Sequence, residues 1–411
     1  MSIRSALATL VFSLFGVSAA EGTPGSQQYY PKINIPLNEV VTNADSALPE
    51  MVGLDNAMNQ YLATWELKGL SLAIVRNDSL VFAKGYGWAD IENRTRMEPN
   101  MLLRVASVSK LITAAGIMVL RDRGQLDLDT KVFGPEGLLA GEPYKKVQND
   151  TSFQKINVEM LLRHQGGFRS DPIFSTETVQ KAYGLEREPK GDDYIRYGLG
   201  RGLAFEPGTS QSYSNLGYVL LSRIIETISE QDYEQFIIDN VLEPAGCYDI
   251  HIAGNTEDKR RANEVKYYSH DTKHESYGMN DLVESQGAGG WCASTLEIAK
   301  FVCSIDGRYE VPDIMSRRAV DEMTYYDPEH PEWFAFGWND TNPETGWSRT
   351  GTLTGTSALV KKFPDGECWI LVTNTSTWKG ARFTKESAAL FDECRAKYSH
   401  LLPHRDLFYW E

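Results

Sequence analysis

The chain has little cysteine and no surplus of positive charge. Five cysteines in 411 residues are too few for a disulfide scaffold, and none stands in a Cys-x-x-Cys pair of the kind that binds zinc. Because five is odd, one thiol must be free or paired between chains in an oxidising compartment. The formal net charge of −15 argues against nucleic acid and anionic membranes as partners. Calcium-rich surfaces stay compatible with this charge, although solubility alone explains it more often.

Long apolar runs are also missing after the N-terminus, so no later segment is expected to cross a membrane. The N-terminus itself is different. Arg4 gives a positive start, residues 6–20 are apolar or small, and residues 17–20 offer a small-residue cleavage site. This apolar run is short for a membrane span. We therefore expect residues 1–20 to be a cleaved secretory signal and the protein to be extracellular.

The remaining chain divides into a polar leader segment, 21–48, and one domain, 49–411. Strand-like runs lie near both ends of this domain, at 70–75, 80–86, 334–338, 357–363 and 368–373. The middle is mostly helical, with patterns at 107–121, 160–162, 217–228, 233–241 and 298–302, and another helix follows at 384–398. This order predicts an α/β (α+β) fold: one antiparallel sheet built from both termini, flanked by helices, with an inserted helical subdomain.

Three local expectations can be checked directly. The helix that begins at Ser107 should carry its apolar residues on one face. Ser294-x-x-Glu297 should form a capping box. Cys292 and Cys303 should lie around one helix, about 16 Å apart if both are helical, which is too far for a disulfide.

Serine acyl chemistry needs a nucleophile, a base and oxyanion donors, and a Ser-x-x-Lys motif places an amine one helical turn from a serine. The chain holds three copies, which are Ser107/Lys110, Ser152/Lys155 and Ser376/Lys379. Ser152 lies in a polar stretch, and Ser376 follows a strand. Only Ser107 opens a long apolar helix, where backbone N–H groups favour negative charge. Ser107 and Lys110 are therefore the candidate nucleophile and base.

Two further motifs support this choice. Tyr213-Ser214-Asn215 is the only Tyr-x-Asn in the chain, and it precedes a predicted helix. Arg349-Thr350-Gly351 is the only basic-Ser/Thr-Gly triplet, and it precedes a β-rich segment where glycine permits close approach of a substrate. Each motif alone is weak evidence, but together and in this order they predict one site. No Gly-x-Ser-x-Gly is present, which argues against an α/β-hydrolase.

In this order the three motifs resemble those of class C β-lactamases and of related penicillin-binding proteins and esterases. The resemblance extends from about residue 70 to residue 375. It includes Tyr86-Gly87-Trp88-Ala89-Asp90, Leu161-Leu162-Arg163-His164-Gln165-Gly166-Gly167, Phe205-Glu206-Pro207-Gly208-Thr209, Glu243-Pro244-Ala245-Gly246 and Gly287-Ala288-Gly289-Gly290. The resemblance implies a β-lactamase-like fold.

The resemblance also implies roles. Ser107 would be the nucleophile, Lys110 would help to take its proton, and Tyr213 would be the second acid–base group. Asn215 would hydrogen-bond the substrate and Lys110. The oxyanion hole would be formed by the backbone N–H groups of Ser107 and Thr352, the residue that follows the third motif.

Arg349 departs from the family pattern, which most often has Lys or His at this position. An arginine keeps the positive charge and can grip a substrate carboxylate through two hydrogen bonds, but it cannot exchange a proton. We therefore expect Arg349, with Thr350, Gly351 and Thr352, to bind substrate.

The favoured function is a secreted serine hydrolase that acts on a small-molecule or peptide ester or amide. No cofactor or metal is expected. The alternative is an acidic extracellular, calcified-matrix component with weak or no activity, although no Asp-rich run is present. Five glycosylation signals agree with secretion without proving it, at Asn77, Asn93, Asn149, Asn339 and Asn374.

Overall fold

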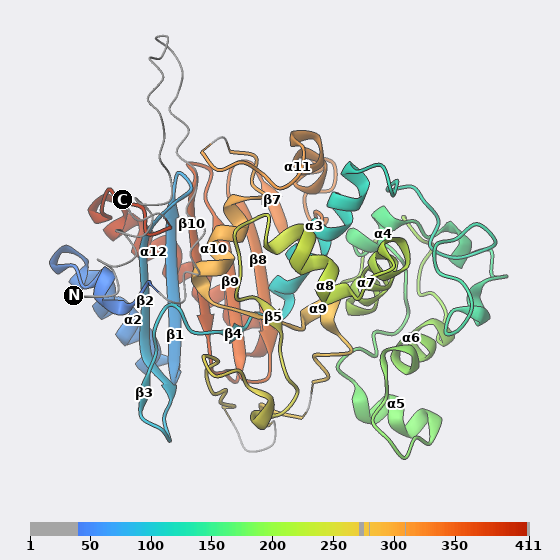
Figure 1. The fold of residues 1–411 in the computed structure, drawn as a ribbon, viewed down its shortest axis with the longest axis horizontal. Helices are drawn as coiled ribbons and strands as arrows, with labels where there is room; N and C mark the ends of the chain where they lie inside the picture. Colours follow the sequence, from blue (N-terminus) through green and yellow to red (C-terminus); the bar gives the residue numbers. More distant parts are fainter. Residues whose placement is uncertain (1–39, 271–274, 279, 309, 409–411) are drawn as a thin grey trace, which may run out of the picture. The chain divides into compact units, whose positions relative to one another are not determined.

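A seven-stranded antiparallel sheet is built from both ends of the described chain (Figure 1). The computed structural model describes residues 40–270, 275–278, 280–308 and 310–408. The strand order is β3-β2-β1-β10-β9-β8-β7. The strands are β1 Gly69–Arg76, β2 Ser79–Asp90, β3 Thr95–Arg96, β7 Asp340–Asn342, β8 Gly346–Leu353, β9 Thr356–Lys362 and β10 Glu367–Thr373. Because β1 pairs directly with β10, the predicted sheet from both termini is confirmed.

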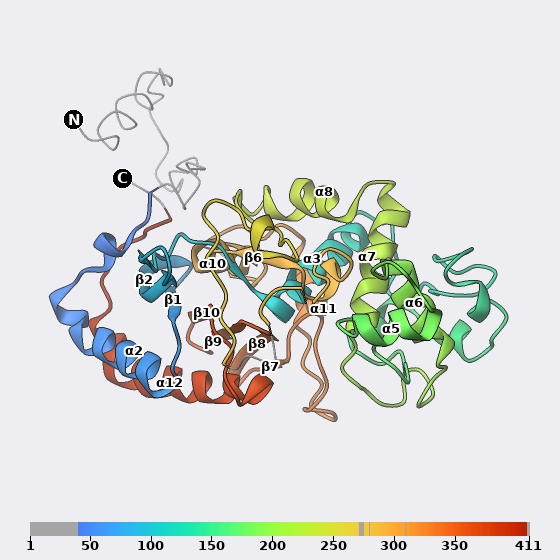
Figure 2. The same ribbon diagram turned by 90° about the horizontal axis from the view of Figure 1, so that it is seen from below.

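The central strands are buried on both faces, so β1 carries apolar residues on both faces, with Ser71 as its one fully buried polar residue, instead of alternating. Leu70, Leu72 and Ile74 face a core that includes α2 (Val52–Thr64) and α12 (Phe383–Tyr398). Ala73 and Val75 face the second and larger core, to which α3 (Ser109–Asp122) and α10 (Thr295–Cys303) belong. Figure 2 shows these two pairs of helices on opposite sides of the sheet.

The mostly helical insert lies beyond the β8–β7 side of the sheet (Figure 1). Its helices and those that follow are α4 Val158–Leu162, α5 Thr176–Tyr183, α6 Gly191–Gly200, α7 Asn215–Ser229, α8 Tyr233–Ile237, α9 Gln286–Gly289 and α11 Arg317–Met323. A small second sheet has the order β4-β6-β5 and comprises β4 Leu103–Arg104, β5 His251–Ile252 and β6 Trp291–Ala293. Asn157 caps α4, with its side chain accepting from the Met160 N–H at 2.9 Å.

Three local predictions need correction. The helix α3 is buried on every side over 109–120, not on one face, because the sheet and the insert enclose it. Residues 334–338 form no strand; Gly337 has φ +80°, and a Cβ there would lie 2.9 Å from the Lys110 carbonyl oxygen. The Ser294 cap is half of a capping box: Ser294 accepts from the Glu297 N–H, but the Glu297 carboxylate accepts from the Tyr248 N–H instead.

The cysteine prediction is right in outcome and wrong in part of its reason. Cys292 lies in β6, and only Cys303 lies in the helix α10. All five cysteines are buried with free thiols. The Cys292–Cys303 pair is therefore unbonded, but a strand-to-helix change separates the two residues.

The N-terminal predictions mostly concern residues outside the described part of the chain. The predicted signal, 1–20, and residues 21–39 of the predicted leader fall there. Residues 40–48 lie against the domain: the Asn43 side chain accepts from the Gly85 N–H at 2.7 Å and donates to the Met97 carbonyl at 2.8 Å. The boundary at 49 stays a prediction. No described helix is long and apolar enough to cross a membrane.

The glycosylation signals differ in accessibility. Asn77, Asn93 and Asn149 are exposed. Asn374 is fully buried, and its Nδ2 donates to three backbone carbonyls, among them that of Trp88 at 3.0 Å. Folded protein therefore cannot accept a glycan at Asn374.

Candidate active site

Ser107 lies in a 3₁₀ turn, Ala106–Val108, between β4 and the helix α3. Ala106 adopts a left-handed backbone with φ +48°, a strained conformation that surrounding structure must hold in place. The strand β8 packs closely against this turn at Gly351. A Cβ at this position would lie 2.4 Å from the Val105 carbonyl oxygen and 3.0 Å from the Ser107 nitrogen. Only glycine allows this approach, which brings the third motif beside the first.

The motifs meet at the Ser107 hydroxyl. The Tyr213 hydroxyl donates to Ser107 Oγ at 2.7 Å, and Lys110 Nζ lies 3.4 Å from the same oxygen. Lys110 also donates to Asn215 Oδ1 at 2.8 Å and to the Ala288 carbonyl at 2.5 Å. The predicted convergence of residues more than 100 positions apart is therefore confirmed.

Burial and charge tune the two groups beside Ser107. Burial lowers the pKa of Lys110 to about 8, and the nearby Arg349 charge acts in the same direction. Burial alone would raise the pKa of Tyr213, but the positive charges of Lys110 and then Arg349 outweigh it and lower the value to about 8. Tyr213 as a residue is 37% exposed, while its hydroxyl is held between Ser107 and Arg349. Both groups can thus exchange protons near neutral pH.

Arg349 is buried and already engaged in the site. Its side chain has no exposed surface; Nε donates to the Ser107 carbonyl oxygen at 2.7 Å, and Nη2 donates to the Tyr213 hydroxyl at 3.0 Å. Nη1 has no hydrogen-bond partner within the described residues. Because two of its nitrogens are engaged and the third is buried, Arg349 does not present the open two-pronged grip on a substrate carboxylate that the sequence suggested.

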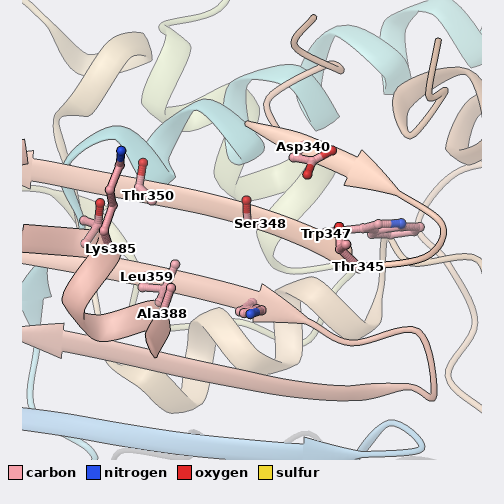
Figure 3. A pocket seen from close by; sticks show the side chains of 11 residues that line it. Asp340, Thr345, Trp347, Ser348, Thr350, Leu359, Lys385 and Ala388 are labelled. Atoms are coloured by element: carbon pink, nitrogen blue, oxygen red, sulfur yellow. The ribbon is translucent and has the colours of Figure 1, made fainter. Parts of the chain in front are cut away.

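Thr350 points away from Ser107. Its hydroxyl donates to Asn339 Oδ1 at 3.0 Å, and it lines a hollow of about 240 Å³ between the outer face of β8 and the helix α12. Figure 3 shows Thr350, Ser348 and Lys385 around this hollow. Because strand residues alternate, Arg349 and Gly351 face the Ser107 turn, whereas Thr350 does not. The predicted substrate contact through the Thr350 side chain is therefore wrong, and the hollow is not part of the Ser107 site.

Thr352 follows Gly351 and pairs with Ser357 of the neighbouring strand β9. This position is compatible with the predicted oxyanion donor, because β8 crosses the Ser107 turn one residue earlier. Asn215, the first residue of the helix α7, holds Lys110 as expected.

Comparisons with known proteins agree with this geometry. A family model described as Beta-lactamase matches residues 54–391. The chain belongs to this family. Over 330 residues it is 26% identical to Protein flp of Staphylococcus aureus (strain MRSA252), covering 78% of this chain and 62% of that protein. Over 316 residues it is 26% identical to Penicillin-binding protein 4* of Bacillus subtilis (strain 168), covering 73% and 66%. In both cases the chain spans less than two thirds of the relative.

Solved structures share the β-lactamase-like fold. D-amino acid amidase from Ochrobactrum anthropi SV3 has a TM-score of 0.66 at 20% identity, with 84% of this chain and 99% of that chain covered. The octameric penicillin-binding protein homologue from Pyrococcus abyssi has a TM-score of 0.65 at 21% identity, with 84% and 77% covered. At such low identity these matches establish the fold and leave the substrate open.

The other two Ser-x-x-Lys copies of this β-lactamase-family chain do not form serine–lysine pairs. Lys155 binds Glu206 at 2.6 Å on the surface, and Lys379 binds Glu386 at 2.5 Å. The Ser376 hydroxyl is buried without a hydrogen-bond partner among the described residues. Only the Ser107 copy combines a nearby amine with a second acid–base group.

Sequence reasoning missed three contributors to the site. Ala288 supplies a carbonyl to Lys110, and His164 packs against Tyr213; both lie in stretches that resemble the family, but no role was assigned to them. The Asp171 carboxylate accepts from the Asn215 and Leu216 N–H groups at the start of α7, and no sequence signal pointed to it. Within the described residues, no cluster of His, Cys, Asp and Glu side chains could hold a metal.

Proposed function

We propose that this protein is a secreted serine acyl hydrolase in which Ser107 forms an acyl-enzyme with an ester, amide or peptide substrate. The observation that carries the proposal is the hydroxyl of Tyr213, which lies 2.7 Å from Ser107 Oγ and has a pKa lowered to about 8. At pH 7 about a tenth of such a group is ionised, which is enough for a general base. The two buried cations Lys110 and Arg349 lower this pKa, and such shifts are typical of catalytic acid–base groups.

The first half-reaction follows from the contacts. Ser107 Oγ attacks the acyl carbon and passes its proton to Tyr213, while Lys110 stabilises the phenolate. Charge on the tetrahedral oxyanion is met by the backbone N–H groups of Ser107 and Thr352. Tyr213 returns the proton to the leaving amine or alcohol, the bond to the leaving group breaks, and the acyl group stays on Ser107 as an ester.

The second half-reaction reverses these roles. A water molecule gives its proton to Tyr213 as its oxygen bonds to the acyl carbon. The ester bond to Ser107 then breaks, Ser107 Oγ takes the proton back, and the free acid leaves. Arg349 holds both the Ser107 carbonyl and the Tyr213 hydroxyl, so it keeps the two reacting groups together through both steps.

A small acyl amide is a reasonable first substrate class, since one structural neighbour is a D-amino acid amidase. The direct test is labelling with a fluorophosphonate probe followed by mass spectrometry of the labelled peptide. We expect the adduct on Ser107, its loss in Ser107→Ala, and unchanged labelling in Ser152→Ala and Ser376→Ala. An unlabelled wild-type protein, or an adduct that survives Ser107→Ala, would contradict the proposal.

Secretion is a separate part of the proposal and needs its own experiment. N-terminal sequencing of protein expressed in a secreting host should find a mature chain that begins just after Ala19 or Ala20. Retention of Met1 and the apolar run in the purified protein would contradict it.

A further inference from the structure

His164 contacts three consecutive residues around Tyr213. Its carbonyl oxygen accepts from the Ser212 N–H at 2.9 Å, and its ring Nδ1 accepts from the Ser214 N–H at 3.1 Å. Between these two bonds, the imidazole ring lies 4.5 Å from the Tyr213 ring at an angle of 38°. The segment that carries Tyr213 is thus fixed before, at and after the tyrosine by one residue.

The His164 ring is itself tightly held. It is 2% exposed, and its centroid lies 5.1 Å from that of Tyr218 and 4.8 Å from that of Phe334, which packs edge-on. Its backbone is left-handed, with φ +59°, as is that of Ala106 before the nucleophile. Non-glycine residues in this conformation cost free energy, and they gather at sites where geometry matters.

The hydrogen bond from Ser214 also determines the protonation state of the ring. Because Nδ1 accepts, the ring must be neutral with its proton on Nε2. The charged and titratable groups that face it are Lys110 from α3, Arg349 from β8, and Tyr213 and Tyr218 on either side. Burial, with Lys110 and Arg349, lowers the pKa of His164 well below its usual value, so the bond persists through the neutral range.

We infer that His164 is a positioning residue for the proposed acyl-transfer reaction: it holds the Tyr213 hydroxyl on Ser107 by clamping the chain on both sides of the tyrosine. This inference rests on the proposed function of Ser107. His164 touches neither Ser107 nor the reacting atoms, and its buried, neutral ring takes no proton from the substrate. Its effect is on where the Tyr213 hydroxyl lies.

Two variants separate the contribution of the His164 Nδ1 acceptor from that of its aromatic ring. His164→Phe keeps a ring against Tyr213 and removes the Nδ1 acceptor, which leaves the Ser214 N–H unpaired. His164→Asn keeps an acceptor, removes the aromatic face, and suits a left-handed backbone. Gln165→Met is the matched control, because Gln165 is the adjacent buried residue and its side-chain nitrogen has no hydrogen-bond partner among the described residues.

The first readout is the rate of fluorophosphonate labelling and the split between kcat and KM for a small acyl amide. A displacement of about 1 Å at a reacting group costs about 100-fold. We expect His164→Phe to lower kcat about 10–100-fold with KM nearly unchanged, His164→Asn to lose less, and Gln165→Met to behave as wild type. Labelling and kcat equal to wild type in both His164 variants would overturn the inference.

The second readout does not need turnover. Ultraviolet difference titration against Tyr213→Phe reports ionisation of Tyr213 alone, because the remaining tyrosines cancel. In His164→Phe we expect this titration to move to higher pH, since the hydroxyl leaves Lys110 and Arg349. An unchanged titration would contradict the inference, whether or not the wild type is active. Inactivity of the wild type by itself would contradict only the proposed function of Ser107. If neither His164 variant folds, His164 is structural and the inference is wrong.

Discussion

Two groups of buried charges lie in the same domain and behave in opposite ways. The Ser107 cluster comprises Ser107, Lys110, Tyr213 and Arg349. The Asp78 cluster comprises Asp78 from the β1–β2 turn, Lys362 at the end of β9, and Asp306 and Arg308 after the helix α10. The first has two cations beside one tyrosine, and the second has two buried carboxylates, Asp78 and Asp306, beside two cations.

The balance between burial and neighbouring charges sets the direction of the pKa shift in each cluster. In the Ser107 cluster the cations lower the pKa of Tyr213 to about 8. In the Asp78 cluster, burial and then the neighbouring Asp306 raise the pKa of Asp78 to about 7. Asp306 is paired with Lys362, whereas neither oxygen of Asp78 has a hydrogen-bond partner among the described residues. The same low-dielectric interior thus holds a tyrosine with a lowered pKa in one place and a carboxyl group with a raised pKa in the other.

The sharpest test of this contrast removes the buried amine from each cluster. Lys110→Met should lower kcat/KM by about 10²–10⁴-fold, because Tyr213 loses the positive neighbour that does most to lower its pKa. The free energy of unfolding should change little, since the lost hydrogen bonds are offset by relief from burying an ammonium group. Steady-state kinetics and chemical denaturation measure the two effects.

Lys362→Met is the matched control at the other cluster. It leaves Asp306 without its ion-pair partner and removes one of the two positive charges near Asp78, so we expect a loss of about 3–5 kcal/mol in the free energy of unfolding. The folded fraction should keep wild-type kcat/KM. A large loss of activity per folded molecule in Lys362→Met, or a large loss of stability in Lys110→Met, would show that the clusters do not divide these roles.

Arg349→Lys tests whether the cation of the Ser107 cluster positions the site or reads the substrate. One ammonium cannot replace both the Nε bond to Ser107 and the Nη2 bond to Tyr213, so kcat/KM should fall about 10–100-fold on acidic and neutral acyl substrates alike. The acid limb of the kcat/KM profile should move little, because lysine keeps the positive charge with which Arg349 lowers the pKa of Tyr213. A loss confined to acidic substrates would restore the carboxylate-binding role that the sequence suggested.

Asp78→Asn should have the smallest effect, and it tests the acidic cluster. The folded pKa of about 7 exceeds the usual 3.8, so the folded protein binds a proton that the unfolded chain releases. Stability from this group is full below about pH 4 and is lost as pH rises through about 7. The variant should abolish this dependence, on the order of 1–3 kcal/mol, with unchanged kcat/KM.

Free energies of unfolding at several pH values provide the measurement for Asp78→Asn. Asparagine suits the left-handed backbone of this position, φ +58°, so strain should not mask the result. Asp392→Asn is the matched control, because Asp392 lies on the surface and pairs with Lys361. Equal pH dependence in Asp78→Asn and wild type would refute the account of the Asp78 cluster.

Much of the fold could be predicted because its signals are local. The predicted strand runs at 70–75, 80–86, 357–363 and 368–373 each depend on a few adjacent residues, and they form the strands β1, β2, β9 and β10. The strand prediction for residues 334–338 is wrong because an apolar run alone cannot show that Gly337 must lie against the helix α3. Ser107, Lys110 and Tyr213 could be predicted as site residues because local signals stand beside their motifs. A predicted long apolar helix begins at Ser107, and another predicted helix follows Tyr213.

By itself, the sequence determined the family, the sheet that joins both termini, and which serine has a lysine one helical turn away. Tertiary structure alone decided that Arg349 is buried with two of its nitrogens engaged, that Thr350 faces the opposite side of β8, and that His164 clamps Tyr213. The reason is physical: burial, hydrogen-bond partners and pKa values arise from neighbours in space, and for these residues most of those neighbours lie 50 to more than 200 positions away along the chain.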